Sequence, residues 1–165
     1  MAVTLPTSRS IAMHEAHHAA ALCLSGMVPR QVRTDHPRRD RLGLVSVDWG
    51  EAGVDRDGAK HVLVAILVGG MTEGFAGWQE WPIDPGRLPE GACHDAEAAA
   101  VLAGYIGVTD RATWRFYVWK ANQLARRSQF RRLALAIADE LERVEVLSAQ
   151  DLEELIATTE EPWST

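Results

Sequence analysis

The first segment with a regular hydrophobic pattern runs from residue 8 to residue 24. Alanine and other apolar side chains recur there at helical spacing, as on the buried face of a helix. Thr7 or Ser8 can accept hydrogen bonds from the first amides of such a helix. Ser25-Gly26 follows the last apolar residue, and glycine commonly ends a helix. We therefore predict a helix over residues 8–24.

Two short strands are predicted after this helix. Residues 31–33 place one valine between two polar residues, and residues 44–49 alternate between two sets of side chains. A period of two residues is that of a strand with one buried and one wet face. A turn over residues 36–40 would join the strands into a small β-hairpin.

A second helix is predicted from residue 59 to about residue 78. It is apolar on most sides, which is typical of a helix at the centre of a domain. Gly69-Gly70 lowers its intrinsic helix propensity by about 1 kcal/mol per glycine. Such glycines often let a neighbouring helix come close, and we expect this neighbour to be the helix over residues 8–24.

The remainder of the chain is predicted to be helical after a proline-rich loop over residues 81–91. Further helical segments are expected over residues 98–105, 110–127, 130–146 and 152–158. Thr109-Asp110 and the residues 148–151 supply capping side chains. The pattern predicts a mainly α fold with one small β-hairpin, formed by a single domain over residues 1–165. Residues 1–6 are expected to be a loose terminus.

The composition narrows the classes of function. The formal net charge of −6 argues against nucleic acid as a partner. No basic start followed by an apolar core indicates a signal peptide, and the longest apolar run, residues 62–68, is too short to span a bilayer. The two cysteines do not suggest a disulfide framework. We expect a soluble, cytoplasmic protein without a membrane partner.

One motif in the first helix carries chemistry. His14 and His18 enclose Glu15 in a His-Glu-x-x-His sequence, and a helix places the two histidines on one face, one turn apart. Two imidazoles at this separation can bind one Zn²⁺, while Glu15 lies beside them, within reach of a water on the metal. The alternative is a solvated helical face that happens to carry clustered histidines.

The chemistry of the motif is that of a hydrolase. Zinc lowers the pKa of a bound water from about 15.7 towards 7. Glu15 would take a proton from this water during attack on a carbonyl and pass it to the leaving amine. Hydrolysis of a non-peptide amide would use the same chemistry.

A catalytic zinc usually has a third protein ligand, and periodicity alone does not choose it. The residues of suitable chemistry are Asp95, Glu73, Cys93, His94, His61 and Glu97. Glu73 is either a surface glutamate or a buried acid that orients a ligand or Arg9.

Several short motifs together resemble a known family. Arg9 precedes the segment His14–Ala19, and Leu42-Gly43 precedes the second predicted strand. Gly69–Glu73 and Gly91–Asp95 then follow in order. This succession, and the character of the last two helices, resembles the peptidase domain of FtsH-type AAA+ proteases over nearly the whole chain.

The resemblance implies a zinc metalloendopeptidase that cuts unfolded or flexible polypeptides. By position, it implies that His14, His18 and Asp95 hold zinc and that Glu15 is the catalytic base. It further implies an edge strand that pairs with the substrate backbone. The residues of this strand are Leu44, Val45, Ser46 and Val47, and Glu73 and Arg9 are expected to support the site.

The chain departs from the family pattern in three respects. His17 replaces the glycine of the motif and either competes for metal or is a bystander. Met71 replaces an arginine. We also expect neither an ATPase domain nor a membrane anchor, so the chain would cut accessible segments independently of ATP unless a separate ATPase or adaptor acts with it.

The alternative function is that of a catalytically weak or inactive binding or regulatory module. A homo-oligomer and a monomer are both compatible with the sequence.

Overall fold

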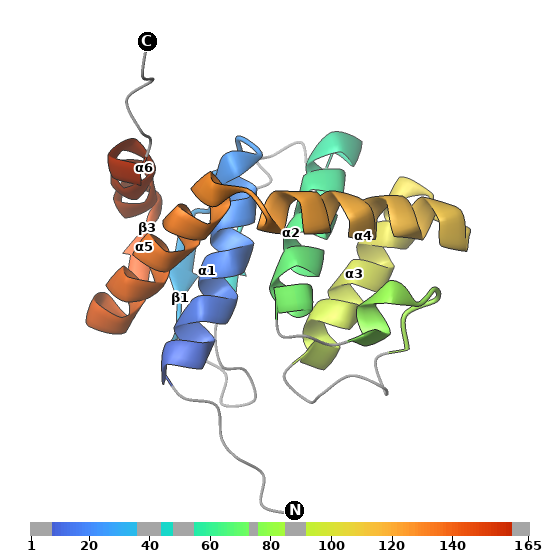
Figure 1. Cartoon of the computed structure of the whole chain (residues 1–165), viewed down its shortest axis with the longest axis horizontal. Helices are drawn as coiled ribbons and strands as arrows, with labels where there is room; N and C mark the ends of the chain where they lie inside the picture. Colours follow the sequence, from blue (N-terminus) through green and yellow to red (C-terminus); the bar gives the residue numbers. More distant parts are fainter. Residues whose placement is uncertain (1–7, 36–43, 48–54, 73–75, 85–91, 160–165) are drawn as a thin grey trace, which may run out of the picture.

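The computed structural model describes residues 8–35, 44–47, 55–72, 76–84 and 92–159 (Figure 1). This part of the chain is mainly helical and contains one small antiparallel sheet, which confirms the predicted fold class. The elements in chain order are α1 (Ser8–Leu24), β1 (Gln31–Arg33), β2 (Leu44–Ser46), α2 (Arg56–Thr72), the 3-10 helix η1 (Ala76–Gln79), α3 (Cys93–Ile106), α4 (Arg111–Ala125), α5 (Ser128–Val144), β3 (Val146–Ser148) and α6 (Ala149–Thr159).

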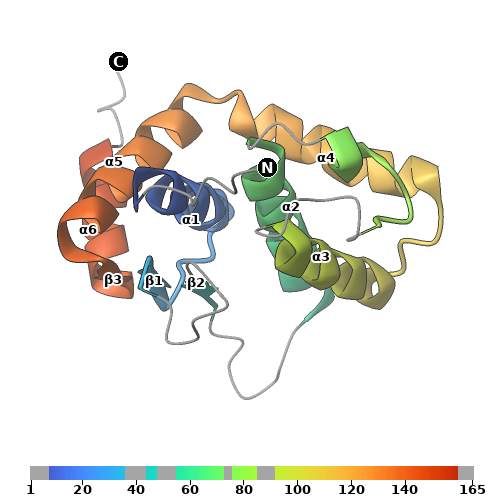
Figure 2. The same ribbon diagram turned by 90° about the horizontal axis from the view of Figure 1, so that it is seen from below.

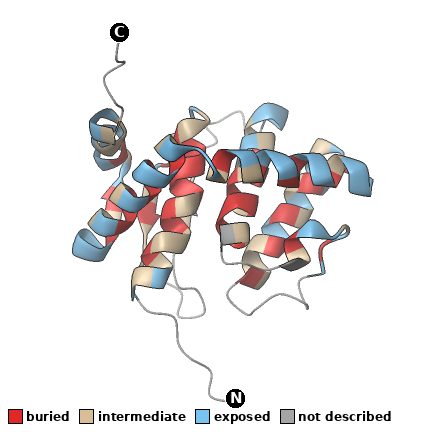
Figure 3. Cartoon of the chain, in the orientation of Figure 1, coloured by how far each residue is buried: buried red, intermediate tan, exposed pale blue. Residues whose placement is uncertain are grey.

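Helix α1 lies at the centre of the fold, between α5 on one side and α2 on the other (Figure 2). Ala12, Ala16, Ala19 and Ala20 are fully buried in these contacts. Alanine adds little bulk beyond the backbone, so both neighbouring helices can approach α1 closely. Burial follows the same plan elsewhere, with the buried sides of the helices turned towards one another (Figure 3).

The sheet has the order β2-β1-β3, with antiparallel pairs throughout. Its central residue is Val32, which is fully buried and pairs with Val45 on β2 and Leu147 on β3. The pairing of β1 with β2 confirms the predicted hairpin strands. Strand β2 ends at Ser46, so Val47, which was predicted to belong to the second strand, follows it.

Strand β3 corrects the prediction of a helix over residues 130–146. Helix α5 ends at Val144, and Glu145 adopts a left-handed backbone with φ of 62°. The carbonyl of Glu145 accepts a hydrogen bond from the amide of Thr34. The chain therefore leaves the helix and pairs with β1, a long-range contact that local periodicity does not report.

Helix α2 also differs from its prediction. It runs over Arg56–Thr72, and Trp78 belongs to the separate helix η1 rather than to a continuous helix to residue 78. A Cβ atom on Gly70 would lie 2.2 Å from the ring of Trp78, so the tryptophan covers α2 where a side chain is missing. Trp78 is fully buried, and its carbonyl accepts a hydrogen bond from the indole of Trp114 at 3.1 Å.

The predicted caps of the later helices are confirmed. The Asp110 carboxylate accepts hydrogen bonds from the amides of Ala112 and Thr113 at 2.7 and 2.8 Å and so caps α4. Ser148 and Asp151 exchange side-chain to backbone hydrogen bonds in the first turn of α6.

Some predicted features lie outside the described residues: the loose terminus 1–6, the turn 36–40, Leu42-Gly43, the end of the second strand at 48–49, Glu73, and the loop after Asp84. Among the helices that are described, none combines the length and the apolar character needed to cross a membrane.

We predict that Gly70→Ala destabilises the protein. The added methyl group must displace the buried Trp78 ring, and overpacking of this kind costs about 1–3 kcal/mol. Gly104→Ala is the matched control, because Gly104 is helical and exposed, and a Cβ atom added there would meet no atom within 4 Å, so stability should be equal or slightly higher. Urea unfolding of both variants measures the difference, and equal stability of Gly70→Ala and wild type would contradict the packing described.

Candidate metal centre

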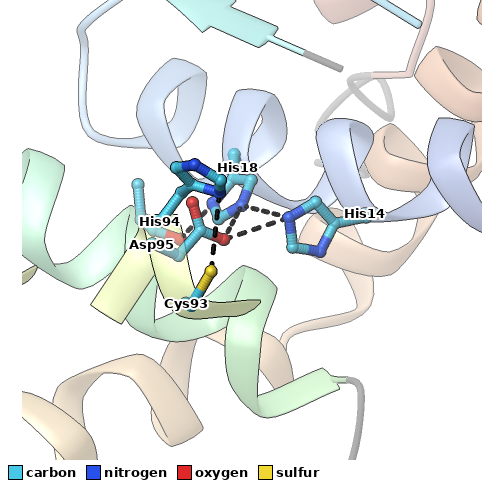
Figure 4. Close-up of polar contacts among 6 residues, drawn as sticks. His14, His18, Cys93, His94 and Asp95 are labelled. Atoms are coloured by element: carbon cyan, nitrogen blue, oxygen red, sulfur yellow. Dashed lines mark hydrogen bonds and ion pairs between the residues drawn. The ribbon is translucent and has the colours of Figure 1, made fainter. Parts of the chain in front are cut away.

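Two helices bring three ionisable side chains together. Helix α1 presents His14 and His18 one turn apart, with their ring centroids 4.5 Å apart and the rings nearly perpendicular. Asp95 projects towards both from the first turn of α3 (Figure 4). Helix α2 contacts α1 and α3, and it thereby sets the position of Asp95 relative to the histidines.

The polar atoms of the three residues converge on one point. Oδ2 of Asp95 lies 3.0 Å from Nε2 of His14 and 3.1 Å from Nε2 of His18. The two Nε2 atoms are 3.0 Å apart. Of the residues that the structure describes, these three form a group of His, Cys, Asp or Glu side chains that could hold a metal ion.

A backbone contact sets the orientation of the His18 ring. Nδ1 of His18 lies 3.0 Å from the carbonyl oxygen of Ala65 on α2, a pair that is buried. A carbonyl can only accept, so Nδ1 carries the hydrogen and Nε2 of the neutral ring presents its lone pair to the centre. Histidines that bind metals commonly make such a second hydrogen bond. Sequence reasoning missed this contact, since every residue has a carbonyl and no side chain marks this one.

Gly69 provides the space for this ring. A Cβ atom on Gly69 would lie 2.2 Å from Cε1 of His18 and 2.5 Å from Nε2. The imidazole therefore lies directly against the backbone of α2. This confirms for Gly69 the expectation that a glycine lets the histidine-bearing helix approach, whereas Gly70 faces Trp78 of η1 instead.

The charges in the centre favour a positive charge beside Asp95. Burial raises the pKa of Asp95, but the charges of His18 and His14 and their hydrogen bonds outweigh burial, so this pKa lies well below its usual value. Burial and the charge of the nearby His14 lower the pKa of His18. The carboxylates of Asp95 and Glu15 raise it by more, so the pKa of His18 lies above its usual value. Nε2 of His18 thus attracts a proton, and a metal ion would take the same place.

Glu15 lies on the same helix but outside the group of three. Its side chain is 7% exposed, and its charge is close enough to contribute to the raised pKa of His18. A buried carboxylate that directly follows one histidine is positioned beside the centre without being one of the three converging residues.

The other candidate ligands have different surroundings. Sγ of Cys93 lies 3.6 Å from Nδ1 of the adjacent His94, and both are half-buried beside the centre (Figure 4). Glu97 is exposed on α3, and His61 is exposed on the first half of α2. Glu73 lies outside the described residues.

The other residues singled out in the sequence lie in the contact between α1 and α5 or on strand β2. Arg9 donates hydrogen bonds to Asp139 and Glu142 of α5, both at 2.6 Å, and so links α1 to α5. The ring of His17 stacks on Phe130 of α5, with centroids 5.7 Å apart. The predicted substrate strand, β2, contacts α1 and is an edge strand of the described sheet. Its residues Leu44, Val45 and Ser46, and the following Val47, are half-buried.

No model of a known protein family matches this sequence, and no curated protein matches it. The resemblance to FtsH-type peptidase domains therefore depends on the motifs of the chain itself and stays a hypothesis. What the geometry adds is that residues 77 positions apart, His18 and Asp95, meet in one centre.

We predict that Asp95→Ala lowers the affinity for Zn²⁺ at least tenfold, because it removes the carboxylate that is the proposed third ligand beside the two histidines. Glu97→Ala is the control, since it removes an exposed carboxylate two positions further along the same helix. Competition with a chromophoric chelator measures both affinities. Equal affinities for Asp95→Ala and wild type, or an equal loss in Glu97→Ala, would contradict the assignment.

Proposed function

We propose that this chain is a zinc-dependent metalloendopeptidase that hydrolyses peptide bonds in unfolded or flexible polypeptides. One observation carries the proposal. His14, His18 and Asp95 converge from two helices, and the buried Glu15 lies beside them on the same helix as the histidines. This is the division of roles that a hydrolytic metal centre needs, with three ligands and one carboxylate for proton transfer.

The donor set fits zinc. Two imidazole nitrogens and one carboxylate oxygen are ligands that zinc accepts, and three protein ligands leave a further position for water or substrate. The hydrogen bond from Nδ1 of His18 to the Ala65 carbonyl supports this role, because it fixes the tautomer that leaves Nε2 available. When bound, zinc supplies a Lewis acid that polarises a carbonyl group and makes water nucleophilic near neutral pH.

The burial of Glu15 beside the histidines supports a role as general base. Its carboxylate would accept a proton from the attacking water as the new bond from oxygen to the carbonyl carbon forms. It would then donate this proton to the peptide nitrogen as the carbon–nitrogen bond breaks. Its burial among the alanines of α1 keeps it apart from bulk solvent, which would otherwise exchange its proton.

The edge strand supports a polypeptide substrate. In the described sheet β2 pairs with β1 on one side, and it contacts α1, which bears both histidines. An extended substrate can add to such an edge through backbone hydrogen bonds, which requires a flexible segment and little sequence preference. The motifs shared with FtsH-type peptidase domains support the same substrate class, and a separate ATPase or adaptor could supply unfolded chains.

The alternative is an inactive binding or regulatory module, and the replacement of the motif glycine by His17 is one reason to consider it. The stacking of His17 on Phe130 supports a packing role for this residue in the contact between α1 and α5. The substitution of the motif glycine is therefore compatible with an intact metal centre, and the peptidase is the proposal that we favour.

We predict that Glu15→Gln keeps zinc and lowers the cleavage of casein at least 100-fold, because the amide keeps the shape of the side chain and loses its capacity to accept a proton. Glu97→Gln makes the same chemical change at an exposed position and should cleave like wild type. Metal content and the rate of peptide release measure the two effects. Cleavage by Glu15→Gln at the wild-type rate would remove Glu15 from the mechanism, and zinc-bound wild type that cleaves no flexible polypeptide would favour the binding module.

A further inference from the structure

A groove lies at the far end of α2 from the metal centre. It has a volume of about 740 Å³ and is bordered by the first half of α2, the second half of α4 and the end of α1. Apolar side chains of Leu24, Val64 and Leu124 contribute to its lining. The proposed catalytic residues are not part of this lining.

The groove carries an excess of positive charge. Lys60, Lys120 and Arg127 line it, and among the described residues of its lining Asp57 is the one carboxylate. Asp57 pairs with Lys60 at 2.6 Å. In the part of the chain that the structure describes, Lys120 and Arg127 form no ion pair, and the ammonium of Lys120 lies 4.8 Å from the ring centroid of Phe116. Both cations are exposed and available to a ligand.

This positive charge continues along the sequence beyond the groove. From residue 111 to residue 138 the chain contains seven arginines and lysines and no aspartate or glutamate. The chain as a whole has a formal net charge of −6. Positive charges, which are outnumbered in the chain as a whole, are thus concentrated on α4 and the start of α5. The outer side of α4 is exposed (Figure 3). A local field of this kind attracts acidic ligands.

A large aromatic side chain borders the same groove. Trp119 is 56% exposed although its indole is one of the largest apolar groups in the chain. Phe116 lies one turn away, is 47% exposed and stacks on Trp119. Exposed tryptophan beside an apolar recess is typical of surfaces that bind other polypeptides, where it supplies much of the binding energy.

We propose that this groove binds a flexible, acidic polypeptide segment whose carboxylates flank an apolar side chain. The carboxylates contact Lys120 and Arg127, and the apolar side chain enters the recess beside Trp119. The inference rests on the proposed function, for which it names a class of substrate and a docking site. Nucleic acid is a poorer match, because a long polyanion would extend beyond the two cations of the groove over a chain with a formal net charge of −6, whereas a short acidic segment need contact only Lys120 and Arg127.

The groove and the metal centre lie along the same helix, on different faces of it. Lys60 and Gly69 are nine residues apart on α2, which is about 14 Å along the helix axis and about two and a half turns around it. An extended chain needs about four or five residues for the axial distance alone, and more to pass around the helix. A segment held in the groove would therefore raise the local concentration of its neighbouring residues at the metal centre.

The test uses the full chain with zinc and the Glu15→Gln change, so that bound peptide is not consumed. The probe is a fluorescent peptide of about twelve residues in which glutamates flank one leucine between glycine and serine spacers. A second peptide has glutamine in place of each glutamate. Fluorescence anisotropy should give at least tenfold tighter binding for the acidic peptide, and its affinity should fall as salt is raised from about 50 to about 500 mM.

Variants locate the binding. Lys120→Glu and Arg127→Glu should each weaken binding of the acidic peptide at least tenfold, whereas Arg30→Glu makes the same change of charge on an exposed residue before β1 and should alter it less than twofold. Trp119→Ala should weaken binding in the same way, with Tyr105→Ala, an exposed aromatic on α3, as its control. Circular dichroism checks that each variant is folded.

Four results would overturn the proposal: equal affinity for the acidic and neutral peptides, equal losses in Lys120→Glu and Arg30→Glu, tighter binding of a single-stranded oligonucleotide than of the acidic peptide, or a dimer in sedimentation that Lys120→Glu dissociates.

The proposed peptidase function and the proposed groove can fail independently of each other. Casein cleavage by wild type without peptide binding would overturn the groove alone. Peptide binding without any cleavage by wild type would support the groove and contradict the peptidase.

Discussion

The position of one imidazole ring constrains much of this structure. His18 projects from α1, donates through Nδ1 to the Ala65 carbonyl on α2, and directs Nε2 at Asp95 on α3. The ring lies where Gly69 has no side chain, so the two helices must approach closely for the contact to form. Three helices are thus held together at a single side chain, and the candidate metal centre depends on this arrangement.

Helix α1 packs against α5 and α2 with different faces. Its buried alanines let α5 and α2 approach from opposite sides, and Arg9 and His17 are used in the contact with α5. His14, Glu15 and His18 remain for the centre shared with α3. The groove at the end of the same helix adds cationic and aromatic groups to this arrangement. In the function that we propose, one helix pair supports both a place that holds a flexible chain and a place that cuts it.

The sequence predicted those features of the fold and the site that depend on residues close together in the chain. Helical spacing, the caps at Asp110 and Ser148, and the glycine pair all depend on residues a few positions apart, and the structure agrees with them. Periodicity could not choose Asp95 from several candidate ligands, because the choice depends on how α3 packs against α2. It also missed β3, whose partner strand is more than 100 residues away, and the Ala65 carbonyl, which no side chain identifies. Glu73 lies outside the described residues and stays a prediction.

The central claim is that three side chains from two helices bind one metal ion while Glu15 stays unbound. Crystals of the zinc-loaded protein, measured on both sides of the zinc absorption edge, test it most directly. The account predicts a single strong anomalous peak within about 2.0–2.2 Å of Nε2 of His14, Nε2 of His18 and one carboxylate oxygen of Asp95. A peak held instead by Cys93 and His94, or no peak in fully metallated crystals, would contradict it.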